Sequence, residues 1–217
     1  MNIQLQILPL LSVLFLFLVA PVVIILAVSF WDYTEFSLIP DFVLTNYIEI
    51  FESGVTYSTY LNTFKFAFLG WLFTVIIGFT LAYFLAFHVR TLRWQIILFL
   101  ICTIPFWTSN IIRMIAWIPV LGRNGLMNSL LLELGVIGEP LEWLLYSDFA
   151  VILAFVHLYT LFMLVPIFNS MMRIDKSIIE AAQDMGANSL QILINVIIPL
   201  CLPGIAIGTI FVISLIM

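Results

Sequence analysis

Long apolar runs alternate with short polar segments along the chain, and five of the runs are long enough to cross a lipid bilayer. A transmembrane helix needs about 20 residues, at about 1.5 Å per residue, to cover roughly 30 Å of hydrocarbon. The pattern therefore predicts an all-α transmembrane protein with one membrane domain over residues 1–217. The predicted spans are 7–30, 61–87, 95–120, 149–171 and 198–217, and the loop 172–197 is expected to lie outside the bilayer.

Basic residues are unevenly distributed between the polar segments. The loops 88–94 and 172–197 contain two each, whereas the segment 31–60 has none and 119–148 has only Arg123. Lys and Arg are enriched in the cytoplasmic loops of membrane proteins. We therefore predict a multi-pass protein whose N-terminus and 172–197 loop face the cytoplasm.

The first apolar run and the two outer segments have features of their own. Residues 7–30 lack the basic segment and the small-residue cleavage site of a signal peptide, so we predict a retained helix. Helix-spaced apolar residues at Phe42–Phe51 and Leu126–Leu134 predict short helices that lie in the membrane interface.

Composition places most of the chain in lipid and excludes several classes of function. Of the 217 residues, 64% are hydrophobic and 9% are charged, whereas about 25% are charged in soluble domains. No G-x-x-x-x-G-K-[ST], H-E-x-x-H or G-x-S-x-G motif occurs, so the sequence offers no P-loop, zinc-protease or hydrolase site. We predict that the chain is not an enzyme, holds no metal or other cofactor, and draws its energy from a partner. Cys102 and Cys201 are expected to be buried apolar residues.

The 172–197 loop is predicted to form two short helices joined at a glycine. Ser177 and Glu180 have the spacing of a capping box, which would start the first helix. Gly186 would end that helix, and Asn188 would cap the second one. The chain is expected to break where it re-enters the membrane, at Pro199 and Pro203.

Small residues follow Glu180 on the first of these helices. We expect Ala181 and Ala182 to be exposed, which would let another protein approach the helix closely. The whole segment, EAAQDMGANSLQILINVIIPLCLPG over 180–204, resembles the EAA loop of bacterial ABC importer permeases. The residues that this resemblance implies in coupling to an ATPase are Glu180, Ala181, Ala182, Asp184, Gly186, Ala187 and Pro199.

The resemblance also implies a fold and a set of partners. The fold is the helical bundle of a type I ABC importer permease, in which the first loop helix docks in a groove of a separate ATP-hydrolysing subunit. The implied partners are a second permease subunit, two cytoplasmic subunits that bind Mg-ATP, and an extracytoplasmic substrate-binding protein, with no nucleic acid. The implied location is a bacterial inner membrane. Such permeases usually have at least six spans, so we expect this chain, with about five, to be truncated before the final span or spans.

The third apolar run indicates a subfamily. The segment PFWTSNIIR over 105–113, followed by Ala116-Trp117, is most similar to the spermidine/putrescine-type permeases, which implies a polyamine cargo. An importer for another small solute, such as iron, thiamine or an opine-like compound, is the alternative. A channel, a secondary carrier and a structural assembly subunit are rivals from other classes, and a carrier has no ATPase for an EAA loop to bind.

Polar and aromatic side chains within the spans are the candidates for the translocation path. A charge inside the bilayer is costly and faces a partner or an aqueous path. Arg113 lies beyond the helix interruption expected at Pro105; either it lines the path, or it snorkels outward or pairs with Glu142 and serves stability. A cationic cargo favours a structural or gating role for Arg113. The candidate path residues are Trp107, Ser109, Asn110, Arg113, Trp117 and His157, with packing between helices as the alternative for the aromatic residues and the histidine.

Overall fold

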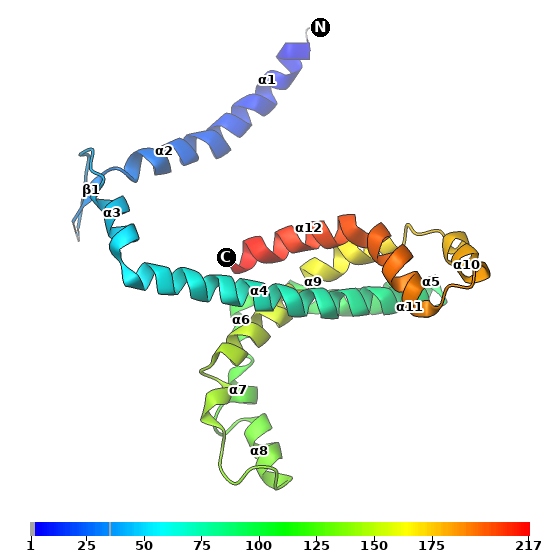
Figure 1. Cartoon of the computed structure of the whole chain (residues 1–217). Coiled ribbons are helices and arrows are strands. Elements are labelled where there is room, and N and C mark those ends of the chain that lie inside the picture. The colour runs from blue at the N-terminus through cyan, green and yellow to red at the C-terminus, as the bar shows by residue number, and fades with distance from the viewer. Residues whose placement is uncertain (1–2, 35) are drawn as a thin grey trace. The chain divides into compact units, whose positions relative to one another are not determined.

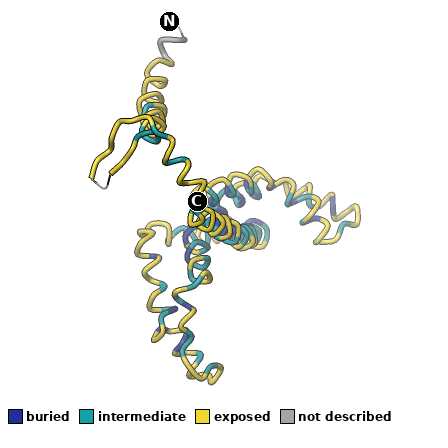
Figure 2. Tube along the Cα trace, turned by 60° about the vertical axis from the view of Figure 1, so that its left-hand side comes forward, coloured by how far each residue is buried: buried dark blue, intermediate teal, exposed yellow. Residues whose placement is uncertain are grey.

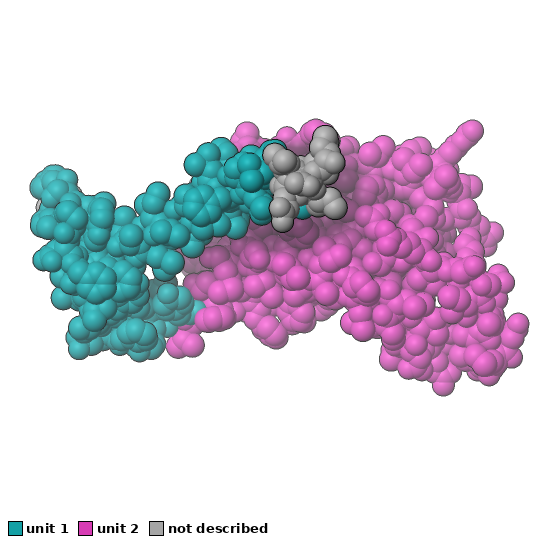
Figure 3. All heavy atoms as spheres, turned by 90° about the horizontal axis from the view of Figure 1, so that it is seen from above, with its two compact units in different colours: residues 1–60 teal, residues 61–217 magenta. Residues whose placement is uncertain are grey.

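The computed structural model describes residues 3–34 and 36–217, and it divides into two compact units, residues 1–60 and 61–217 (Figure 3). Helices dominate both units (Figure 1). In the described part of the chain, four helices are long and apolar enough to cross a membrane, and one bent pair makes a fifth if it counts as a single span. The predicted all-α transmembrane class is therefore confirmed.

The first unit begins with one long apolar helix, in which none of the residues Ile7–Val28 is buried (Figure 2). Its apolar surface is what lipid would cover. The helix consists of α1 (Ile3–Leu14), the π-turn η1 (Phe15–Val19) and α2 (Ala20–Val28).

A two-stranded hairpin and a short helix follow this helix in the first unit. They are the antiparallel strands β1 (Asp32–Tyr33) and β2 (Leu38–Ile39) and the short helix α3 (Thr45–Glu52). The side-chain amide of Asn46 donates to the carbonyls of Ser29 at 3.2 Å and Trp31 at 2.8 Å. Because these carbonyls lie at and just beyond the end of α2, Asn46 ties α3 to the end of the apolar helix.

The second unit is built from long helices and one bent segment. α4 (Gly54–Tyr83) enters it from the first unit and continues as the π-turn η2 (Phe84–His88). The other apolar helices are α5 (Leu92–Thr103) with η3 (Ile104–Trp107), α9 (Asp148–Met171), and α11 (Ser189–Ile192), η5 (Leu193–Ile197) and α12 (Ile198–Ile216) in succession.

Small residues let α4, α9 and α12 pack closely. On α12, a Cβ at Gly204 would lie 2.5 Å from the carbonyl oxygen of Pro166, and one at Gly208 would lie 2.6 Å from Sδ of Met163. On α4, the buried positions recur every three or four residues, which places them on one face of the helix. Close packing of small residues is a main source of helix association in membranes. The buried α4 residues are Ala67, Gly70, Thr74, Gly78 and Ala82.

The apolar run 95–120 is not one straight helix. Leu92–Trp107 and Asn110–Glu133 are bent by 95° relative to each other. Pro105 offers no backbone N–H, and Thr108 has extended backbone angles of φ −93° and ψ 152°, so the helical hydrogen bonding stops there. Beyond the bend lie α6 (Asn110–Ile115), α7 (Ile118–Leu121), α8 (Leu126–Glu133) and the 3₁₀ turn η4 (Glu142–Leu144).

Candidate functional site

The helix α10 (Lys176–Asp184) lies in the loop between α9 and α11, and its start differs from the prediction. Asp175 is the N-cap: its carboxylate accepts a hydrogen bond from the backbone N–H of Ser177 at 3.0 Å. That hydrogen bond holds the pKa of the exposed Asp175 carboxyl below its ordinary value. The predicted capping box of Ser177 and Glu180 is therefore wrong, because the helix begins two residues earlier than that box requires.

The end of α10 follows the sequence prediction. Gly186 has φ +84°, a left-handed backbone that glycine adopts without strain. The N–H of Gly186 donates to the carbonyl of Gln183 at 2.8 Å, and the N–H of Ala187 donates to that of Ala182 at 3.0 Å. These two bonds form a Schellman motif, which satisfies carbonyls that the helix end leaves open. Gly186 therefore separates two distinct helices, as predicted.

A reciprocal cap starts the second helix of the loop. The N–H of Gln191 donates to Oδ1 of Asn188 at 2.9 Å, and the N–H of Asn188 donates to Oε1 of Gln191 at 2.8 Å. The predicted cap at Asn188 is confirmed. The expected break at the prolines is not found, because Ser189–Ile216 is one helical run that contains Pro199 and Pro203. The π-turn η5 comes directly before α12, whose second residue is Pro199.

The two alanines that follow Glu180 differ in burial, because successive residues point about 100° apart around a helix. Ala182 is buried with 6% of its surface exposed, packed in the same core as Met171 and Ile192. Glu180 and Ala181 are exposed. The expectation that Ala182 shares an exposed surface is wrong, because one 100° helical step turns it toward the membrane helices. Asp184 is exposed and Ala187 is partly buried.

The exposed surface of α10 includes apolar side chains besides Ala181. Ile178 is 45% exposed and Met185 is 83% exposed, on the same side of the helix as Ala181 by their spacing. Glu180, which is exposed, borders a cavity of about 360 Å³ whose other walls include Tyr83 of α4 and Phe87 of η2. α10 therefore has one face against the membrane helices and another that nothing in the described chain covers.

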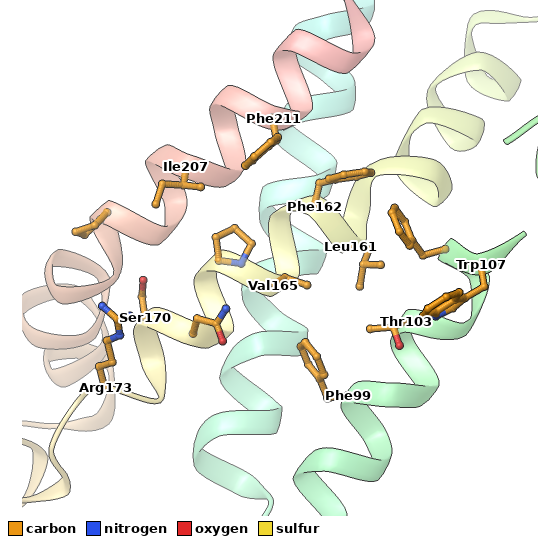
Figure 4. A pocket seen from close by; sticks show the side chains of 14 residues that line it. Phe99, Thr103, Trp107, Leu161, Phe162, Val165, Ser170, Arg173, Ile207 and Phe211 are labelled. Carbon is orange, nitrogen blue, oxygen red and sulfur yellow. The ribbon is translucent and has the colours of Figure 1, made fainter. Parts of the chain in front are cut away.

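A larger cavity, of about 710 Å³, lies between α5, α9 and α12 (Figure 4). Arg173 and Ser170 lie at one end and Trp107 and Thr103 at the other. Asn169 also lines the cavity, and no acidic side chain does. Five of its 14 lining residues are aromatic, namely Phe99, Phe106, Trp107, Phe162 and Phe211.

The candidate path residues do not line a single cavity in the structure. Trp107 lines the 710 Å³ cavity, whereas Arg113, Trp117 and His157 line a second cavity of about 330 Å³. Ser109 and Asn110 line neither of the two.

Arg113 is buried, with 7% of its surface exposed. Its Nη2 donates to Oδ1 of Asn110. The predicted alternative of an Arg113–Glu142 pair is wrong, since Glu142 pairs with Arg123 at 3.1 Å instead.

Sequence reasoning missed the wall of the large cavity and the tight helix contacts. The cavity combines residues from three helices, and no short motif marks such a set. The helix contacts did have a signal: Gly204 and Gly208 form a G-x-x-x-G pattern within an apolar segment.

Comparisons with known proteins agree with this architecture. The chain is 35% identical to the spermidine/putrescine transport system permease protein PotB of Escherichia coli over 201 residues, which cover 92% of this chain and 71% of that protein. It is 30% identical to PotB of Haemophilus influenzae over 203 residues, covering 93% and 69%. No family model matches the chain.

A solved structure has the same fold. It is a bacterial ABC transporter involved in the import of the acidic polysaccharide alginate, with a TM-score of 0.74 and 18% sequence identity. The match covers 98% of this chain and 72% of that one. At this identity, the likeness concerns the fold alone.

Proposed function

The chain belongs to the family of the spermidine/putrescine transport system permeases, and on this premise we propose that its cargo is a polyamine, spermidine or putrescine. It is a membrane-spanning permease subunit of an ABC importer and not itself an enzyme. The aromatic rings toward the Trp107 end of the 710 Å³ cavity support a cationic cargo, because ammonium groups are attracted to the faces of aromatic rings, whereas Arg173 at the other end would repel it.

The observation that carries the coupling proposal is the outward face of α10. A helix outside the membrane that exposes Ile178, Ala181 and Met185 has an apolar surface suited to another protein. The sequence has no P-loop of its own. We therefore propose that α10 docks on an ATP-hydrolysing subunit at Glu180 and Ala181, and that ATP-driven closure of two such subunits moves α10 and the helices packed on it.

The remaining partners and the orientation belong to the same proposal. A second permease subunit completes the path, two cytoplasmic subunits bind Mg-ATP, and an extracytoplasmic binding protein delivers the cargo. This chain holds no cofactor. Its N-terminus faces the cytoplasm, as the basic residues of the 88–94 and 172–197 loops indicate. Of the coupling residues, Ala182, Gly186, Ala187 and Pro199 shape α10 and its surroundings, whereas Glu180, Ala181 and Asp184 are available for contact.

Uptake by the complete transporter tests the cargo. We expect proteoliposomes that contain all subunits and enclose Mg-ATP to accumulate radiolabelled spermidine when the binding protein is present outside. Unlabelled putrescine should compete, whereas thiamine, ferric iron and an opine should not. Accumulation of one of these other solutes in place of spermidine would make that solute the cargo. Accumulation without ATP would identify a carrier or channel.

A further inference from the structure

The guanidinium of Arg113 has no counter-ion in the described chain. Its one hydrogen bond goes to the neutral amide of Asn110, and its Nε is buried without a partner among the described residues. The two ion pairs found there join Lys65 to Asp148 and Arg123 to Glu142. A buried charge that lacks a partner is strongly unfavourable. An anionic group is therefore missing beside Arg113.

The sequence shows that the spans of this chain cannot supply that group. None of its 12 acidic residues lies within Ile7–Val28, Gly54–His88, Leu92–Trp107 or Ser189–Ile216. Asp148 is the first residue of α9 and already pairs with Lys65. The apolar helix of the first unit, Ile7–Val28, contains no Asp or Glu, so it cannot provide the missing carboxylate either. The missing anion is therefore not carried by these spans.

A groove leads to Arg113 along α4 and α9. It combines the 330 Å³ cavity with a neighbouring one of about 240 Å³, and the two share Ile77, Leu153 and Val156. The smaller part lies toward the start of α9 and is lined only by apolar residues, which include Phe73 and Phe149. The part that contains Arg113 also contains His157, nine residues and so about 13 Å further along α9 than Asp148. The groove is thus apolar near the first turns of α9 and carries the charge of Arg113 near the middle of α9.

The apolar outer part and the charged inner part of the groove favour some ligands over others. A phospholipid would place its phosphate near the level of the Lys65–Asp148 pair and its tails deeper, which is the reverse of what the groove offers. A polyamine is a cation and is repelled by Arg113. A transmembrane helix with one carboxylate in its span fits both parts: its apolar face would lie on Phe73, Ile77 and Phe149, and its Asp or Glu would reach Arg113.

We propose that this groove receives a helix of the second permease subunit, and that an Asp or Glu of that helix forms an ion pair with Arg113. The proposal rests on the proposed function, which supplies the second permease. A membrane-buried ion pair of this kind would fix the register of the two subunits, because separating the two charges within the bilayer is costly. Arg113 is then an assembly residue outside the path of the cation.

Recovery of the second permease with an affinity-tagged version of this chain tests the pair. In the complete complex, Arg113→Met should lower that recovery at least tenfold, and Arg113→Lys should lower it less because the charge remains. Arg123→Met is the control, since it also removes an arginine, but one that is exposed and paired with Glu142 on the surface; recovery should stay within twofold of wild type. Unchanged recovery with Arg113→Met would overturn the proposal.

A second arm leaves this chain unaltered, so that a folding defect of Arg113→Met cannot decide the result. Each carboxylate in the spans of the second permease is neutralised in turn, to Asn or Gln. One of these changes should reproduce the loss of recovery, and adding Arg113→Met to it should cause little further loss. If none does so, or if the losses multiply, the anion has another source, such as a lipid, a carboxylate-bearing cargo or a further segment of this chain. If the wild-type chain recovers no second permease, the proposed function fails as well.

Discussion

The indole N–H of Trp117 donates a hydrogen bond of 3.2 Å to Nδ1 of His157. Their rings also meet edge to face, with centroids 5.6 Å apart and planes at 88°. Trp117 belongs to the segment beyond the 95° bend and His157 to the middle of α9, 40 residues further along the chain. Because Nδ1 accepts, it carries no proton. This contact secures the bent segment to the membrane helix that carries the core.

Trp117→Phe and His157→Phe each remove this hydrogen bond and keep an aromatic ring in place. We expect each to lower the free energy of unfolding by about 0.6 kcal/mol, the average for side-chain hydrogen bonds in a membrane protein. The double variant should lose no more than either single one, since the bond can be broken only once. Chemical denaturation of the purified complex measures this. Trp143→Phe, whose ring packs edge to face on Phe149, is the control for losing an indole; additive losses from the first pair would contradict a direct bond.

Gly204→Ala places a methyl group against the backbone of α9. Its Cβ would lie 2.5 Å from the carbonyl oxygen of Pro166, and backbone cannot move aside as a flexible side chain can. We expect a loss of about 1–3 kcal/mol, the usual cost of overpacking, seen as a lower midpoint of thermal unfolding. Ala206→Val adds carbon atoms to the same helix at an exposed position and should change the midpoint little. Equal midpoints for the two variants would show that α9 and α12 do not approach so closely.

Ala181 and Ala182 should respond oppositely to enlargement. Ala182→Leu should destabilise the subunit by about 1–3 kcal/mol, because Ala182 is packed in the core. Ala181→Leu should leave the stability within about 0.5 kcal/mol of wild type and reduce binding of the ATPase, because Ala181 lies on the outward face. Thermal unfolding and co-purification, measured on both variants, separate the two effects. The reverse assignment would place the docking face on the other side of α10.

The N-cap of α10 should depend on pH. Hydrogen bonding from the backbone N–H of Ser177 lowers the pKa of Asp175, so the cap stabilises the helix at pH values above the ordinary Asp pKa. That stabilisation is lost as the pH falls through the lowered pKa. Hydrogen exchange of the first α10 amides, corrected for intrinsic rates, should therefore lose protection in acid. Asp175→Asn keeps an accepting oxygen without titrating, so its protection should not change with pH; an identical acid transition in that variant would assign it to another group.

Local chemistry decided what the sequence could predict. The membrane spans could be predicted from the long apolar runs, because such runs are stable in contact with lipid and not with water. Gly186 and the Asn188–Gln191 pair were predictable because a left-handed turn and a reciprocal cap each need only neighbouring residues. The motifs around Glu180 identified the family for the same reason.

Tertiary packing decided the rest. Asp175 and Ser177 both carry a side chain that can cap a helix, and only the backbone shows which one does. That Ala182 faces inward depends on where α10 lies against the core, which its own residues do not encode. A pair between Arg113 and Glu142 was one alternative for this charge, but Arg113 contacts Asn110 and Glu142 pairs with Arg123. The large cavity needs side chains from three helices at once.

Co-purification of the ATPase with Glu180→Arg tests the central claim that energy enters through α10. Glu133→Arg, the same exchange at the exposed end of α8, is the control. We predict that the wild-type chain and the Glu133→Arg variant retain the ATPase in equal amounts, whereas Glu180→Arg loses at least nine-tenths of it without a change in the yield of folded permease. Full retention of the ATPase by Glu180→Arg would contradict the claim.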